Sequence, residues 1–267
     1  MARAVSEMHP PESARRLVHY EQPLNERMRT FMRLEFLYQQ LLYHFELEAD
    51  WATRAATAGL LDIVAILMRG DVRSDVFKEL DRQIETLERF KGEPAVDKKR
   101  LDALIHNLAD SRAGVNALGP QFLQPLKDSE FLNAIKHRSA IPGGTCEFDL
   151  PLYSHWLRYP YERRARDLGQ WIDAIRPVCD AVVELLWLTR ESAAPKPKVA
   201  INGMYQYNVQ KGANCRLLRV SLPEGSPLFP EISAHQHRFT IRFLECSSID
   251  RRAVQTGHDV SFQLSIG

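Results

Sequence analysis

The chain has 267 residues, of which 45% are hydrophobic and 26% are charged, and its formal net charge is +1. This length can form one large domain or two modest ones, each with its own core, and the near-neutral charge argues against general binding to nucleic acids or membranes. No apolar run is long enough to predict a transmembrane helix, and the first sixteen residues lack the apolar segment of a signal peptide.

The cysteine pattern indicates a reducing compartment. The four cysteines are scattered and form no C-x-x-C pair; they are Cys146, Cys179, Cys215 and Cys246. In a chain of this size, such a pattern is typical of free thiols and not of a disulfide framework. We therefore expect a cytoplasmic protein.

The N-terminal part predicts an arm, an edge strand and a series of helices. Residues 1–16 are polar and form the predicted flexible arm, and residues 17–23 are predicted to be an edge strand that Pro23 ends. Asn25 is a good N-cap, and apolar residues recur at helical spacing after it. Further helices are predicted over 51–68, from Ser74 onward, from Asp97 onward and from Ser129 to just before Pro142. Glu79 lies on the polar, solvent-facing side of the helix from Ser74.

The middle of the chain predicts a turn, a short strand and a long helix. Residues 141–145 favour a turn by their proline and glycine content, and the alternating segment 145–150 is predicted to be a strand. A helix is predicted from Pro151, and the longest helical run extends over about 161–190. Pro177 lies inside this run and is expected to kink or split it.

After the helices the pattern changes to β-structure. Residues 192–198 are predicted to be an extended linker, because this proline-containing segment cannot continue a helix. Residues 216–222 and 237–244 show the alternation and the β-branched and aromatic content of strands. A weaker strand pattern occurs at 204–209 and 260–266.

These elements predict an α+β fold with segregated parts. A helical domain spans 25–191, and a β-strand domain with a mainly antiparallel sheet spans 199–267. The predicted strands at 17–23 and 145–150 lie outside the β-domain in sequence. Because an isolated strand is unstable, we expect both to join the same sheet.

No recognised catalytic signature occurs in the chain. The glycine pair at 143–144 is not followed by the Lys-Ser/Thr of a phosphate loop, and zinc-protease and serine-hydrolase motifs are missing. Cys146 follows a glycine turn, but nothing positions a base beside it, so a small core residue is a simpler interpretation than a nucleophile. His235 and His237 share a strand face, yet zinc needs more ligands than these and Cys246. We expect no enzymatic activity, cofactor or metal.

The strand predicted over 237–244 carries a basic face. Its apolar residues alternate with Arg238 and Arg242, so the two arginines share one face at a separation of roughly 13 Å. Arginine binds carboxylates through paired hydrogen bonds and stacks on aromatic rings. The pattern predicts either a contact for a short acidic peptide or an ordinary exposed strand face. The opposite face is formed by Phe239, Ile241 and Phe243.

A second basic cluster lies in the turn between two predicted helices. It consists of Arg69 and Arg73 in the segment Arg-Gly-Asp-Val-Arg. Turn residues on a rigid scaffold often carry binding functions, although a plain surface turn fits the same pattern.

Several segments, in order along the chain, resemble the ZapD family of cell division proteins. They are QPLNERMRT (22–30) with RLEFL (33–37), RGDVR (69–73) with KELDRQ (78–83), IPGGTCEFDLP (141–151), INGMYQ (201–206) and PEISAHQHRFTIRF (230–243). Together they extend over about 20–244, which is most of the chain, and leave the arm and the C-terminal tail uncovered.

The resemblance implies a cytoplasmic homodimer at the division septum, with a helical and a β-domain. Such proteins bind the C-terminal tail of FtsZ through basic residues and bundle FtsZ filaments, with no known catalytic activity or cofactor. Arg69, Arg238 and Arg242 match the family's basic surface, and Arg73 and His237 are added because they lie beside it. The family often has a more basic residue just before Arg238, so one contact is expected to be weaker or pH-dependent here.

Two alternatives to a protein-binding role remain open. A nucleic-acid-binding module could use the same arginines, but phosphate neutralisation normally needs several clustered cations. A cysteine-dependent enzyme would be built on Cys146. For the protein-binding role, the long apolar face over 168–187, with two tryptophans, supports self-association as a homodimer. We expect no nucleic-acid or membrane partner.

Overall fold

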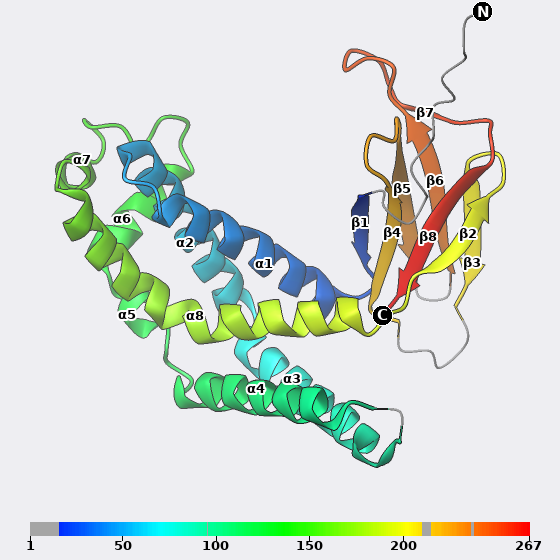
Figure 1. Cartoon of the computed structure of the whole chain (residues 1–267). Coiled ribbons are helices and arrows are strands. Elements are labelled where there is room, and N and C mark those ends of the chain that lie inside the picture. The colour runs from blue at the N-terminus through cyan, green and yellow to red at the C-terminus, as the bar shows by residue number, and fades with distance from the viewer. Residues whose placement is uncertain (1–15, 95, 210–214, 236–237) are drawn as a thin grey trace, which may run out of the picture. The chain divides into compact units, whose positions relative to one another are not determined.

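The computed structural model, shown as a cartoon in Figure 1, describes residues 16–94, 96–209, 215–235 and 238–267. The chain has the predicted α+β composition and divides into two compact units. The sheet unit comprises residues 1–28 and 189–267, and the helical unit comprises residues 29–188. The predicted arm over 1–16 lies outside the described residues apart from Arg16.

The helical unit is built from α1 to α8 and a short 3-10 helix, η2. Their bounds are α1 (Glu26–Phe45), α2 (Asp50–Arg69), α3 (Val72–Glu88), η2 (Arg89–Gly92), α4 (Lys98–Ala117), α5 (Gln124–Lys127), α6 (Glu130–Ser139), α7 (Pro151–Leu157) and α8 (Tyr161–Glu191). Side-chain caps start helices where the sequence predicts them: Asn25 accepts a backbone hydrogen bond in the first turn of α1 (2.8 Å), and Asp97 and Ser129 cap α4 and α6. Asp71 caps α3, which therefore begins before the predicted start at Ser74.

The apolar faces of α1, α2 and α8 form much of the helical core. Its fully buried residues include Leu34, Leu41, Leu60, Ile63, Ile172, Val178 and Val182. The hydroxyl of Tyr38 in α1 donates to Asp180 of α8 (2.8 Å). The apolar face over 168–187 is therefore used largely within this unit, although Trp187 is 40% exposed. α8 continues through Pro177 as one helix instead of splitting.

Residues 145–150 form turns instead of the predicted strand. The Cys146 N–H donates to the Gly143 carbonyl (3.0 Å), and the Leu150 N–H donates to the Cys146 carbonyl (3.0 Å). Because these local hydrogen bonds satisfy the backbone, the segment needs no partner strand. The prediction that it joins the sheet is wrong, whereas residues 17–23 do join it as β1.

α2 is, within the described part of the chain, the one helix that is long and apolar enough to cross a membrane by length and composition. Half of that segment is buried inside the structure. Leu60 and Ile63 lie in the core described above, so the apolar character of α2 is accounted for by packing.

The sheet unit contains two antiparallel sheets. One has the strand order β1-β4-β8-β2, and the other has the order β3-β6-β5, with β7 paired to β6. The bounds are β1 (Leu17–Pro23), β2 (Lys196–Ala200), β3 (Met204–Asn208), β4 (Leu217–Pro223), β5 (Leu228–His235), β6 (Arg238–Glu245), β7 (Val254–Gln255) and β8 (Val260–Ile266). The strands predicted at 17–23 and 260–266 have those bounds, and those predicted at 204–209, 216–222 and 237–244 differ by one residue at their ends.

The two sheets enclose one apolar core. Its buried members include Leu218, Val220, Leu222, Phe239, Ile241, Phe243, Phe262 and Leu264. After β2 the chain passes to the other sheet through a tight turn at Asn202 and Gly203, both with positive φ (48° and 71°). A Cβ atom on Gly203 would lie 2.5 Å from the Thr256 carbonyl oxygen, so glycine is required there for both space and conformation.

Three strands of the sheet unit lie where the sequence did not predict them: β2, β5 and the two-residue β7. β2 occupies part of the predicted linker 192–198 and pairs with β8. Its Pro197 is tolerated because β2 is an edge strand of its sheet. β5 contains Pro230 and was not predicted, yet it pairs with β6 along its whole length.

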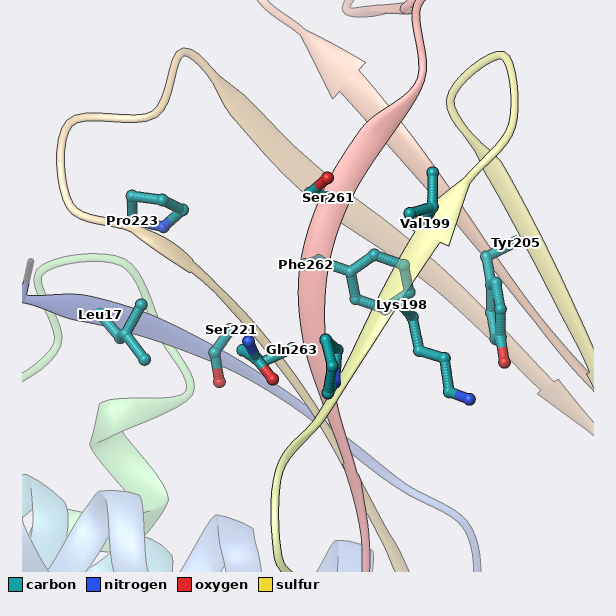
Figure 2. A pocket seen from close by; sticks show the side chains of 10 residues that line it. Leu17, Lys198, Val199, Tyr205, Ser221, Pro223, Ser261, Phe262 and Gln263 are labelled. Carbon is teal, nitrogen blue, oxygen red and sulfur yellow. The ribbon is translucent and has the colours of Figure 1, made fainter. Parts of the chain in front are cut away.

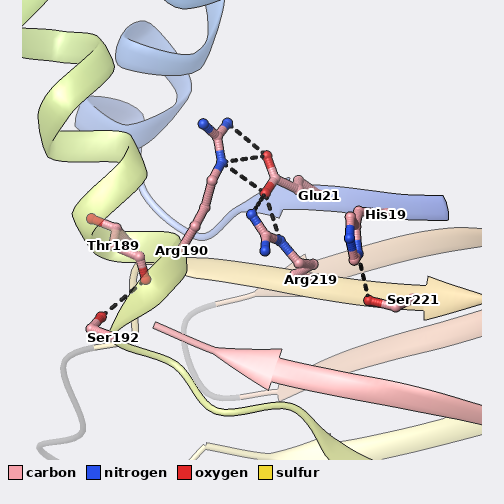
Figure 3. A network of polar contacts seen from close by, with 7 residues as sticks. All are labelled: His19, Glu21, Thr189, Arg190, Ser192, Arg219 and Ser221. Atoms are coloured by element: carbon pink, nitrogen blue, oxygen red, sulfur yellow. Dashed lines mark hydrogen bonds and ion pairs between the residues drawn. The ribbon is translucent and has the colours of Figure 1, made fainter. Parts of the chain in front are cut away.

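Two arginines share one carboxylate in the sheet unit, as Figure 3 shows. Glu21 of β1 accepts hydrogen bonds from Arg190 (Nη2 to Oε2, 2.8 Å) and from Arg219 of β4 (Nε to Oε1, 2.9 Å). The three side chains are only 14–20% exposed. Burial raises the pKa of Glu21, but hydrogen bonds and charges from the two arginines outweigh burial and hold that pKa below its ordinary value.

Glu21→Gln is expected to lower the free energy of unfolding by about 2–4 kcal/mol, because it leaves two mostly buried guanidinium groups without a counter-charge. The folded-state pKa is depressed, so the carboxylate stabilises the fold above the unfolded-state pKa and loses this contribution as the pH falls through the folded-state value. Urea unfolding at pH 7 and at about pH 3 should therefore show a smaller loss on acidification in the variant than in the wild type. An equal loss in both proteins would contradict this role.

Candidate functional site

β6 separates its side chains into a buried and an exposed face, as the sequence predicts. Phe239, Ile241 and Phe243 are at most 1% exposed, whereas Arg238 and Arg242 are exposed. The alternation follows from the strand pleat, and pairing with β3 on one side and β5 on the other holds it in place. The arginines therefore stand on the outer side of a strand whose inner side is locked into the core.

Side chains from the neighbouring strands flank the arginines. In the strand register, Arg242 lies between Met204 of β3 and Glu231 of β5. Met204 is 41% exposed. The surface thus combines basic, acidic and apolar groups on adjacent strands. We call this surface, formed by Met204, Glu231, Arg238 and Arg242, the arginine face.

The two arginines of this face differ in their partners. Arg242 forms an ion pair with the Glu231 carboxylate, and their side chains are 52% and 51% exposed. The residues that the structure describes provide no hydrogen-bond or ion-pair partner for the side chain of Arg238. Arg238 is therefore the more available of the two for an acidic ligand.

Of the two histidines that the sequence singles out, the structure describes only the backbone of His235. His237 lies outside the described residues, together with Gln236. His235 ends β5 and pairs with Arg238 in the strand register. Cys246, the third group considered for zinc, donates from Sγ to the Ser248 carbonyl (3.1 Å). Within the described ranges, no group of three His, Cys, Asp or Glu residues could hold a metal.

Arg69 and Arg73 belong to the helical unit and not to the unit that carries β6. Arg69 is the exposed last residue of α2, and it makes no hydrogen bond or ion pair with another described side chain or backbone group. Arg73 donates from Nε to the Val115 carbonyl (3.0 Å) and from Nη2 to the Asn116 carbonyl (3.2 Å). These bonds satisfy carbonyls at the C-terminal end of α4. Arg73 thus holds the turn in position, and Arg69 presents the available guanidinium.

Glu231 and Met204 were missed as site residues by sequence reasoning. The reason lies in β5, which contains Pro230 and shows no clear alternation, so nothing placed Glu231 opposite Arg242. Met204 is the first residue of a strand that was predicted only weakly. The signal that could have found both is their cross-strand register with β6.

A hollow of about 680 Å³ lies elsewhere in the sheet unit, and Figure 2 shows the side chains that line it. The lining comprises Leu17, Pro197, Lys198, Val199, Tyr205, Ser221, Pro223, Ser261, Phe262 and Gln263. Ser221 contacts Nδ1 of His19 (2.7 Å), but within the described contacts no carboxylate bonds to the other ring nitrogen, as the base of a serine nucleophile normally requires. With one cationic and no acidic lining side chain, the hollow offers no acid–base pair.

Cys146 lies beside a carboxylate and not beside a base. Its Sγ is 3.6 Å from Oδ2 of Asp149, and Asp149 also pairs with Arg138 (3.3 Å). The ring of His155, which the sequence places nearby, contacts the Tyr159 hydroxyl (3.1 Å). Among the described contacts, no histidine lies against the Cys146 sulfur, so this arrangement provides no base for a nucleophile.

Comparison with known proteins adds an independent line of argument. A family model described as cell division protein ZapD matches residues 32–242. The chain is 39% identical over 247 residues to a cell division protein ZapD of Methylococcus capsulatus, covering 92% of this chain and 96% of the relative. It is 37% identical to the protein of that name from Ralstonia pickettii (94% and 99% covered) and 36% identical to the one from Shigella boydii (93% and 98% covered).

Proposed function

This chain belongs to the ZapD family of cell division proteins, and from this membership we propose that it binds the C-terminal tail of FtsZ and bundles FtsZ filaments at the division septum. The observation that carries the proposal is the arginine face: two exposed guanidinium groups on one strand whose opposite side is buried. A near-neutral chain needs such a local patch to bind an acidic peptide.

The chemistry of the arginine face suits a short peptide that mixes acidic and apolar residues. Arg238 offers a carboxylate a guanidinium that has no partner among the described residues, and Met204 offers exposed apolar surface beside Arg242. The Arg242–Glu231 pair does not block binding, because an ion pair between half-exposed groups contributes only about 0–1 kcal/mol. A ligand carboxylate can therefore displace Glu231 or share Arg242 with it at little cost.

The proposal assigns different roles to the residues of the α2–α3 turn. Arg69 contacts the tail, because its guanidinium is exposed and, among the described groups, unpaired. Arg73 supports the turn through its bonds to the end of α4. His237 remains a proposed contact next to Arg238, and its protonation would strengthen binding to an acidic tail at lower pH.

Bundling requires at least two tail-binding surfaces in one particle. A homodimer supplies two, and avidity along a polymer then converts weak single contacts into stable cross-links. In this proposal the protein acts in the cytoplasm. It has no enzymatic activity and no cofactor, and it binds neither nucleic acid nor membranes. Its role is to hold neighbouring filaments together.

The proposal is tested by co-sedimentation with GTP-assembled FtsZ. Filaments of full-length FtsZ should pellet at low speed as bundles that contain this protein, and filaments without the C-terminal tail should not. Equal pelleting with both forms of FtsZ would exclude tail binding. Retention on DNA with a steep salt dependence would instead favour the nucleic-acid alternative.

Cys146→Ala is expected to leave this bundling unchanged, because the thiol has an acidic neighbour and contacts no histidine in the described structure. Circular dichroism and the same sedimentation assay measure the outcome. A variant that is folded but no longer bundles filaments would revive a redox or enzymatic role for this cysteine.

A further inference from the structure

Helices α3 and α4 lie side by side as an antiparallel hairpin, which Figure 1 shows. Asp81 of α3 pairs with Arg112 of α4 across this hairpin. The later part of α4 contacts α8, because the Ser111 hydroxyl donates to a carboxylate there. Lys98, the first residue of α4, lies about 20 Å from Ser111 along the helix axis. The end of the hairpin where η2 leads into α4 is therefore remote from this contact with α8.

This remote end of the hairpin gathers exposed cations beside an aromatic ring. Its cations lie in η2 and in the first turn of α4, and all four are exposed: Arg89, Lys98, Lys99 and Arg100. Phe90, which follows Arg89, is 46% exposed. We call these five residues the basic tip. Because the net charge of the whole chain is only +1, the tip is a local concentration of positive charge.

Acidic neighbours neutralise the basic tip only in part. Glu88 pairs with Lys91 (3.0 Å), which lies outside the tip. Asp97 caps α4 by accepting hydrogen bonds from two backbone N–H groups (3.0 and 3.2 Å), and Glu93 is the remaining acidic neighbour. Among the described residues, the side chains of the four tip cations have no hydrogen-bond or ion-pair partner. An anionic ligand would therefore not have to displace an existing partner from them.

The fold itself gains little from the cations at the start of α4. Lys98, Lys99 and Arg100 are the first three residues of this helix, where the partial positive charge of the helix end disfavours cations. By contrast, α1, α2, α3, α6 and α8 each have an acidic residue in the first turn. The three cations therefore do not stabilise α4, and a ligand that carries carboxylates would relieve their mutual repulsion.

We propose that the basic tip is a second docking surface for an acidic peptide, and that its ligand is the tail of another FtsZ subunit. The inference rests on the proposed function and extends it, because one protomer then holds two tails. Charge complementarity selects an acidic partner, and the exposed Phe90 ring suits a peptide that carries apolar residues beside its carboxylates. Four cations are fewer than the roughly six to ten phosphate contacts of a typical DNA-binding protein, which favours a short peptide.

The basic tip is separate from the tail-binding residues proposed above. Arg238 and Arg242 belong to the sheet unit, whereas the tip belongs to the helical unit. Arg69 lies just before α3, and the 17 residues of α3 place it about 25 Å from the tip. A tail that contacts Arg69 would need about seven further extended residues to reach the tip. Occupancy by two different tails requires no such extension.

The basic tip is expected to bind a tail more weakly than the arginine face does. Two of its four cations are lysines, which lack the paired hydrogen bonds that a guanidinium forms with a carboxylate. Contacts between fully exposed charges are also screened by salt. The tip therefore contributes chiefly through avidity, because a protomer that holds two tails is retained longer on a filament bundle.

Isothermal titration calorimetry with a synthetic FtsZ tail peptide at low ionic strength counts the sites. The wild type should bind two peptides per protomer, one tightly and one weakly. The double variant Lys98→Glu/Lys99→Glu should bind one peptide, with the tighter Kd unchanged. The variant should stay folded and melt at a slightly higher temperature than the wild type, because acidic residues are favoured in the first turn of a helix.

Lys78→Glu/Lys136→Glu is the matched control. It makes the same change in net charge at two exposed lysines of α3 and α6 that lie outside the tip, and it should keep both peptide sites. In co-sedimentation with GTP-assembled FtsZ, the tip variant should need at least about threefold more protein for half-maximal bundling, because it loses the avidity of the second site. The control should bundle filaments like the wild type.

The outcomes distinguish failure of this inference from failure of the proposed function. One tightly bound peptide per protomer in both the wild type and the tip variant would overturn the second surface and leave tail binding intact. One peptide that binds the tip variant more weakly would mean that a single tail spans both surfaces, which also overturns it. Retention on DNA that only the tip variant loses, without a second peptide site, would assign the tip to nucleic acid instead. If the wild type binds no tail peptide, the proposed function itself fails.

Discussion

Arg238→Glu is expected to weaken binding of the FtsZ tail by at least about tenfold. The variant removes a charge-assisted hydrogen bond worth about 1.5–3 kcal/mol and places a negative charge where a carboxylate should dock. Each 1.4 kcal/mol corresponds to about one decade in affinity. Arg238 is exposed and has no partner to lose within the described structure, so stability should change by less than about 0.5 kcal/mol. Fluorescence anisotropy with a labelled tail peptide measures the affinity.

Arg242 provides the comparison within the same face. Arg242→Glu should also weaken binding by about tenfold, but it would place two carboxylates opposite each other because Glu231 is in register with it. Arg242→Gln avoids this repulsion and is the cleaner variant, with a smaller expected loss. Glu231→Gln leaves Arg242 unpaired and should strengthen binding slightly.

The opposite signs of these variants make the prediction sharp. Arg238→Glu must weaken tail binding while Glu231→Gln must not, although both replace one charged residue on the same outer face of the sheet. Normal tail binding by Arg238→Glu and Arg242→Gln would place the site elsewhere. Equal losses of tail affinity in Arg238→Glu, Arg242→Gln and Glu231→Gln would indicate that any change to this surface weakens binding, and not that the arginines form a docking contact.

Phe239→Ala, on the opposite face of β6, is expected to lower the free energy of unfolding by about 3–5 kcal/mol. Phe239 is 1% exposed, and its ring stacks on Tyr207 at 5.1 Å between centroids. Truncation leaves a cavity between two sheets whose other side chains are already packed. Scanning calorimetry should show a fall in the Tm of about ten degrees or more.

The two substitutions separate binding from folding on one strand. At a temperature well below its transition, Phe239→Ala should still bind the tail, since Arg238 and Arg242 stay on the outer face. Arg238→Glu should show the reverse, with normal melting and weak binding. A Phe239→Ala protein that is folded by near-UV circular dichroism yet does not bind would show that the arginine face depends on finer core packing.

Local chemistry predicted much of the helical part. Asn25, Asp97 and Ser129 cap helices at the predicted residues because a cap is a contact between near neighbours in sequence. Glu79 shows the limit of such patterns. Its position on the polar side of α3 predicts exposure, but it is 3% exposed and accepts hydrogen bonds from Arg82 and Gln83.

Elements whose structure depends on contacts with residues distant in sequence were predicted less well. Residues 145–150 alternate like a strand, but whether they form one depends on an unpaired edge elsewhere, and their local turns satisfy the backbone instead. β5 carries Pro230 and was missed, because only pairing with β6 stabilises it. Pro177 did not split α8, since packing in the helical core outweighs the lost hydrogen bond.

For the candidate site, the sequence by itself determined that Arg238 and Arg242 share an outward face, because the period of two is a property of one strand. Only the tertiary structure decided how available each basic residue is. Strand pairing places Glu231 on Arg242, and contact with the end of α4 occupies Arg73. Glu231 lies on a strand whose position depends on pairing, and the end of α4 is distant from Arg73 in sequence. The spacing of residues within one helix or strand does not specify which residues of other elements it will contact.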